Sequence, residues 1–118
     1  MPQRVEQEIL DASRGFADAQ LTLQGSIDID IQRIYTQACW YDSSTNEHEG
    51  CFALVNSGSD LESLVGDIVL VTYKKKSVWV YIVAATNLPT DIGLFRSAWI
   101  RIADLAEDEI GVRVEVRL

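Results

Sequence analysis

The sequence predicts a mainly β protein: a small β-barrel with one crossover helix and an N-terminal extension. Three observations lead to this fold class. Segments rich in β-branched and aromatic residues recur from residue 26 onward. Two of these segments are separated by only a few residues, the spacing of a hairpin. One amphipathic segment, at about residues 94–105, lies between that hairpin and a last alternating segment.

Composition limits the possible partners. The chain has 118 residues, 47% of them hydrophobic, which fits a single globular domain. Its formal net charge of −8 argues against general nucleic-acid binding and against an anionic membrane surface, because both need clustered cations. No apolar run approaches the roughly 20 residues of a membrane span. We therefore expect neither nucleic acid nor membrane as a partner.

Residues 1–25 form the predicted extension, and two conformations fit them. Apolar residues at helical spacing favour a helix: Val5, Ile9, Ala12, Phe16, Ala19 and Leu23. Alternation over residues 19–23 favours an extended segment instead. The segment is either an arm that packs on a neighbouring subunit or an ordinary element of its own domain. It lacks the apolar core of a secretory signal, so we expect synthesis in a cytoplasm without export.

Residues 26–118 are the predicted barrel domain. Ile27, Ile29 and Ile31 alternate with polar residues, which predicts a half-buried strand that continues into "ACWYD". The polar residues 43–50 predict an exposed loop, and residues 51–55 a short strand. Residues 56–67 predict a loop with one helical turn, capped by Ser59 or Asp60.

The segments "IVLVTY" and "SVWVYIVA" predict a central hairpin that turns at Lys74, Lys75 and Lys76. Their nearly continuous apolar character predicts burial on both faces. Pro89 and Gly93 mark a loop before the helix.

The helix predicted at about residues 94–105 has one apolar face, formed by Phe95, Ala98, Trp99, Ile102 and Leu105. Its other face carries Arg96, Arg101 and Asp104. Trp79 and Trp99 are both predicted on core faces. In the last segment Val112, Val114, Val116 and Leu118 alternate with charged residues, which predicts a strand with one wet face that could lie at a subunit edge.

Few residues suggest a metal, a cofactor or a nucleophile. Cys39 and Cys51 are more consistent with free thiols than with a disulfide, although a loop that folds back would allow pairing. His48 is the only histidine, and its spacing from the cysteines matches no common zinc site. No Gly-rich phosphate loop is present. We expect no metal and no cofactor.

From "ACWYD" onward the chain resembles the double-psi β-barrel family of RlpA-like lytic transglycosylases, barwin-like proteins and expansin barrel domains. The similarity lies in the hairpin "IVLVTYKKKSVWVYIVA", in "DIGL" at residues 91–94, and in "SAWIRIADLAEDEIGVRVEV", the helix and final strand. It covers roughly residues 38–118. The resemblance implies a barrel closed by a crossover helix.

The sequence departs from the family at its catalytic positions. In the enzymatic relatives an Asp ends the second hairpin strand and acts as general acid, whereas Ala84 stands at the matching position here. An alanine cannot protonate a leaving oxygen. Gly93 replaces the second acidic residue of the family's "Asp-Ile-Asp" element, Phe95 replaces its helix-capping Ser, and the Cys-Pro-x-x-Cys loop is absent. Asp91 is the one acidic match, and capping or tethering of its loop is the simpler role for it.

The candidate binding residues are Trp40, Tyr41, Asp42 and Asp91. Aromatic side chains can stack on sugars, so a glycan or a protein partner would contact these residues. For the aromatic pair the favoured interpretation is packing, with one ring in the core and the other in a subunit contact. No catalytic residue is assigned.

The hypothesis favoured by these features is a non-enzymatic structural or assembly component of a virus particle, in the capsid or tail of a tailed bacteriophage. Its partners would be copies of itself and other virion proteins, and its location the virion. The alternative is a peptidoglycan- or glycan-binding module that has lost lytic transglycosylase activity. A third hypothesis is an active glycan-cleaving enzyme with its acid at Asp42 or Asp91.

Overall fold

The computed structural model describes residues 31–41 and 51–117. The predicted arm at residues 1–25, the polar loop with His48, Asp42 and Leu118 all lie outside the described residues. Six strands occur in the described part: β1 (Ile31–Tyr41), β2 (Phe52–Asn56), β3 (Ile68–Tyr73), β4 (Lys76–Thr86), β5 (Ile92–Phe95) and β6 (Glu109–Arg117). A 3-10 helix, η1 (Asp60–Leu64), and one α-helix, α3 (Arg96–Ile102), complete them.

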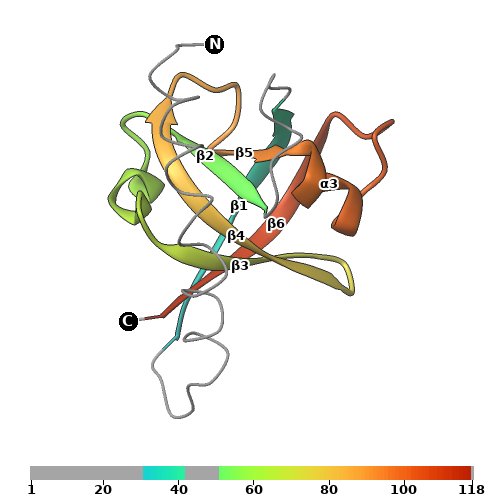
Figure 1. Cartoon of the computed structure of the whole chain (residues 1–118), viewed down its shortest axis with the longest axis horizontal. Coiled ribbons are helices and arrows are strands. Elements are labelled where there is room, and N and C mark those ends of the chain that lie inside the picture. Colours follow the sequence, from blue (N-terminus) through green and yellow to red (C-terminus); the bar gives the residue numbers. More distant parts are fainter. Residues whose placement is uncertain (1–30, 42–50, 118) are drawn as a thin grey trace.

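The strands close into a mixed barrel in the order β1-β5-β2-β4-β3-β6 (Figure 1). The pairs β1–β5 and β2–β4 are parallel, and the other four pairs are antiparallel. The prediction of a small β-barrel with one helix is confirmed, and the topology is compatible with a double-psi barrel. Helix α3 lies between β5 and β6 in the chain, as a crossover helix should.

Alternation along the strands fills the barrel interior. Every second side chain of β6 is buried, at Ile110, Val112, Val114 and Val116, as the sequence pattern predicts. Ala98, Trp99 and Ile102 of α3 join the same apolar cluster. The indole nitrogen of Trp99 donates a 2.9 Å hydrogen bond to the carbonyl oxygen of Asp104, so the buried ring keeps a polar partner.

A second apolar cluster lies on the outer side of the barrel wall. Its buried members are Phe52, Leu54, Val83, Ala84 and Phe95. The pairing of β2 with β4 shifts register between Ala53 and Leu54, which leaves Val83 without a partner on β2. Such a bulge reverses the inward and outward alternation. Ile82 therefore faces the interior cluster, whereas Ala84 belongs to the outer one.

The turns follow the predicted chemistry. Ser59 caps η1, because its hydroxyl accepts a hydrogen bond from the Leu61 amide. Lys74 and Lys75 form the two-residue loop of the β3–β4 hairpin. Lys74 has a φ of 56°, in the left-handed region that two-residue hairpin loops commonly use.

Several predicted boundaries and orientations were wrong. The helix begins at Arg96 and ends at Ile102, not at residues 94 and 105, because the chain around Gly93 forms strand β5. Trp79 is only half-buried, since it alternates with the inward-facing Val78 and Val80. Strand β6 lies inside the sheet, because it pairs with β1 on one side and with β3 on the other, and its predicted place at a subunit edge stays a prediction.

No helix among residues 31–41 and 51–117 has both the length and the apolar character that crossing a membrane requires.

Candidate functional site

The predicted binding residues do not gather in one place. Tyr41 stacks on Phe95 of β5, with ring centroids 5.4 Å apart, and so packs against the outer apolar cluster. Trp40 is 36% exposed, and as the neighbour of Tyr41 on β1 its side chain points to the opposite face of the strand. Asp91 precedes β5, at the end remote from Phe95, so roughly 13 Å of extended chain separates it from the Tyr41 contact. Asp42 lies outside the described residues.

Asp91 ties three segments of the barrel together. Its carboxylate accepts a 2.6 Å hydrogen bond from the Thr36 hydroxyl on β1. Its backbone carbonyl accepts a 2.8 Å bond from the amide of Asn56, at the end of β2. The Asn56 side chain in turn accepts a bond from the Leu88 amide. These bonds place Asp91 in a tethering role for the loop that leads into β5.

The two positions at which this chain lacks an acid of the resembled family, Ala84 and Gly93, are packed with apolar groups. Ala84 is 8% exposed within the outer apolar cluster. A Cβ atom added to Gly93 would lie 3.3 Å from both Leu88 methyl groups and 3.4 Å from the Tyr41 Cβ. A carboxylate at either position would lose hydration without gaining a partner, which raises its free energy.

A different surface carries the exposed aromatic and charged residues. The outer face of β1, β6, β3 and β4 is a continuous four-strand sheet, and the registers align its outward side chains in rows. One row runs Tyr35, Arg113, Thr72, Ser77, and the next runs Arg33, Glu115, Leu70, Trp79. We call these eight residues the Tyr–Arg face.

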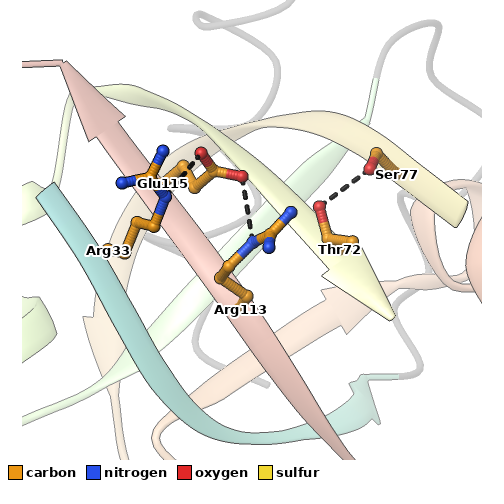
Figure 2. Close-up of polar contacts among 5 residues, drawn as sticks. All are labelled: Arg33, Thr72, Ser77, Arg113 and Glu115. Carbon is orange, nitrogen blue, oxygen red and sulfur yellow. Dashed lines mark hydrogen bonds and ion pairs between the residues drawn. The ribbon is translucent and has the colours of Figure 1, made fainter. Parts of the chain in front are cut away.

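Polar contacts order the centre of the Tyr–Arg face (Figure 2). Glu115 forms ion pairs with two arginines. Its Oε2 atom lies 3.4 Å from Arg33 Nε, and its Oε1 atom lies 3.0 Å from Arg113 Nε. The Thr72 and Ser77 hydroxyls lie 2.8 Å apart across the hairpin. The Glu115 side chain is only 13% exposed, so this pairing is more protected from water than a surface ion pair. Two cations around one anion leave the face locally positive on an acidic protein.

A hollow of about 640 Å³ opens at one end of this face. It exists partly because Gly111 places no side chain beside Gln37. The hollow is lined by Tyr35, Thr36, Gln37, Thr72, Lys74, Asp91, Gly111, Val112 and Arg113. It thus combines an exposed aromatic ring, cations and one carboxylate, a mixture that suits a polar ligand or a partner side chain.

A second hollow, of about 780 Å³, separates the hairpin loop from the end of α3. Lys74, Lys75 and Lys76 lie on one side of it, and Ile100 and Asp104 on the other. The Tyr73 hydroxyl donates a 3.0 Å hydrogen bond to Glu107 across this region. The opposed charges and the hydrogen bond favour a structural contact between hairpin and helix here.

Cys39 and Cys51 are both buried free thiols. Burial raises the pKa of the Cys51 thiol, although Arg101 and a hydrogen bond with Ser97 partly oppose this effect. A raised pKa reduces the thiolate fraction, so Cys51 is a poor nucleophile at neutral pH. In the described part of the chain, no three His, Cys, Asp or Glu side chains are grouped as metal ligands.

No protein-family model matches the sequence, and no curated protein matches it significantly. The case for a function therefore rests on the geometry.

Sequence reasoning missed the Tyr–Arg face. The alternation of Arg113, Glu115 and Arg117 marked a wet strand face, but its neighbours could not be known without the register. Only the pairing of β6 with β1 and β3 brings Tyr35 and Thr72 beside Arg113.

Proposed function

We propose that the protein is a non-enzymatic structural or assembly component of a virus particle, in the capsid or tail of a tailed bacteriophage. It is built on a double-psi-like barrel that resembles cell-wall enzymes. Its partners are other copies of itself and further virion proteins.

The observation that carries this proposal is the Tyr–Arg face. Tyr35 is 75% exposed, directly opposite Arg113 on the neighbouring strand, with the half-buried Trp79 on the same sheet. Tyrosine, tryptophan and arginine are the residue types that dominate the binding energy of protein interfaces. A sheet that presents them on rigid strands is suited to a permanent contact with another subunit.

The surroundings of the resembled catalytic positions also favour a structural role. Ala84 offers no proton, and its apolar surroundings suit a methyl group. The Asp91 carboxylate is engaged by Thr36 and supports the β5 loop.

The test is peptide mass spectrometry of purified particles from cells that carry this gene. The proposal expects the protein in the particles at many copies each, comparable to known structural components. In parallel, Tyr35→Glu should prevent incorporation, because it removes the ring and places a carboxylate in a contact. Ile100→Glu, at the exposed and remote Ile100 of α3, is the matched control and should incorporate normally. Absence of the protein from intact particles would refute the proposal.

The alternative function is a peptidoglycan- or glycan-binding module without lytic activity. The hollow beside Tyr35 supports it, because an exposed ring next to Gln37, Asp91 and Arg113 offers both stacking and hydrogen bonds to a sugar. Sedimentation with purified peptidoglycan distinguishes the two functions. A glycan-binding module should sediment together with peptidoglycan, and Tyr35→Ala should abolish this binding. A particle protein without glycan binding should stay in solution.

A further inference from the structure

Strand β1 has an unpaired edge in the described part of the chain. On one side β1 pairs with β6 along its length, from Ile31 to Cys39. On the other side it pairs with β5 only from Ala38 onward. Residues 31–37 therefore present backbone amides and carbonyls to no other described strand. In Figure 1 the start of β1 and the end of β6 run together away from the barrel.

This edge has the features of a strand-pairing site. An exposed edge is a template for another strand unless charges, a proline or a bulge protect it. Arg33 is the one charged residue among residues 31–37, and Glu115 already pairs with it. Ile31 and Tyr35 are 45% and 75% exposed, so apolar surface accompanies the open backbone.

We propose that a second copy of this chain pairs with the edge. The two β1 strands run antiparallel about a two-fold axis at Ile34, which places Arg33 of each copy opposite Tyr35 of the other. This proposal rests on the proposed function, since it names the self-contact through which an assembly protein would associate. The contact is isologous, the commonest arrangement in homodimers.

The alternation of side chains selects this register. Residues that face each other must point to the same side of the sheet, and Arg33 and Tyr35 both lie on the outer face. An axis at Arg33 would oppose two arginines, which is unfavourable. An axis at Tyr35 would place Gln32 and Ile31 opposite Ala38 and Cys39, which already pair with β5. An axis at Ile34 avoids both problems.

The chosen register also adds favourable contacts. The guanidinium of Arg33 can lie over the Tyr35 ring of the other copy, a cation–π contact. Ile34 packs against the barrel core in its own copy, and its exposed remainder meets the same residue across the axis. The backbone of the edge gains hydrogen bonds that the described part of a single copy does not supply.

Cysteine crosslinking of the full-length chain tests both the contact and its register. The variants Arg33→Cys and Tyr35→Cys are treated with a short crosslinker that carries two thiol-reactive groups, separately and as an equimolar mixture. The proposed register crosslinks the mixture several-fold more than either variant alone, because like positions lie diagonally, roughly 7–8 Å apart. Wild-type chain controls for the two buried cysteines. Dominant crosslinking of Arg33→Cys alone, or of Tyr35→Cys alone, would identify the other registers and overturn this one.

Light scattering gives an independent measurement. Wild type should weigh twice 13.2 kDa, or a multiple of that dimer. Tyr35→Phe, which keeps the ring, should retain this mass, whereas Tyr35→Lys should give monomers because it opposes a lysine to Arg33. Ile100→Lys is the matched control and should remain dimeric. A 13.2 kDa wild-type monomer without crosslinks overturns the inference and leaves the edge to a different partner.

The two proposals fail separately. A monomer that is abundant in purified particles would refute the self-pairing and leave the virion role standing. A crosslinked dimer that is absent from particles would support the self-pairing and refute the virion role.

Discussion

The Thr36 hydroxyl donates a 2.6 Å hydrogen bond to the Asp91 carboxylate, joining residues 55 positions apart in the sequence. This contact fixes the start of β5 against β1, where the two strands begin their parallel pairing. Asp91, the one acidic residue that fits the pattern of the resembled family, thus supports the fold of the barrel.

Removing this contact should destabilise the protein. Thr36→Val keeps the shape of the side chain and deletes the donor, so we expect a loss of about 0.5–1.5 kcal/mol. Asp91→Asn retains an acceptor oxygen, so its free energy of unfolding should fall by less than that of Thr36→Val. Urea denaturation measures both effects as a lower midpoint at an unchanged slope. An unchanged midpoint for Thr36→Val would show that water replaces the bond fully.

Trp99 should be the most sensitive position of the helix. Trp99→Ala leaves a large cavity where α3 meets the barrel core and should cost about 3–5 kcal/mol. Trp99→Phe keeps most of the volume but leaves the Asp104 carbonyl without its donor, so about 1 kcal/mol should be lost. Thermal and urea unfolding report both values. Ile100→Ala, one residue away on the exposed face, serves as control and should change stability by less than about 0.5 kcal/mol.

Restoring the acid of the resembled enzymes should destabilise the fold without producing activity. Ala84→Asp places a carboxylate in the outer apolar cluster and should cost about 2–4 kcal/mol at pH 7. Ala84→Asn has the same shape without the charge. Burial would raise the pKa of the new Asp, so its penalty is present above its unfolded pKa and falls as the pH drops. The free energies of unfolding of Ala84→Asp and Ala84→Asn should therefore converge as the pH falls, which unfolding curves at several pH values measure. Release of soluble muropeptides from peptidoglycan by Ala84→Asp would contradict the prediction that no activity appears.

Cys51 should make stability depend on alkaline pH. Burial, its main influence, raises the pKa of this thiol above the ordinary value of 9.0. The folded state therefore keeps the proton longer than the unfolded state does. The associated stability is full below pH 9.0 and is lost as the pH rises through the folded pKa.

Comparison with Cys51→Ala isolates this contribution. The difference in unfolding free energy between wild type and Cys51→Ala should shrink from pH 8 to pH 10.5. Val55→Ala deletes buried apolar atoms without a titratable group, so its difference from wild type should stay constant. Parallel pH profiles for wild type and Cys51→Ala would rule out the linkage.

The strongest local patterns predicted their elements well. The hairpin, the helix face around Trp99 and the last strand follow from alternation and helical periodicity, because each pattern is long and is repeated within one segment. Strand β5 was missed because it has four residues, one of them Gly93, and is held by β1 and β2, which are remote in sequence. The orientation of Trp79 was missed because a continuous apolar run does not reveal which residues face inward.

The sequence by itself determined that this chain forms a β-barrel with one crossover helix, and that an alanine stands where the resembled enzymes need an acid. Those features reside in periodicity and residue identity, which are local. Only the tertiary structure decided which residues meet. It separated Tyr41 from Asp91, brought Tyr35 beside Arg113, and left part of β1 without a described partner. These outcomes depend on strand order and register, which pairing across long sequence distances sets and no local pattern encodes.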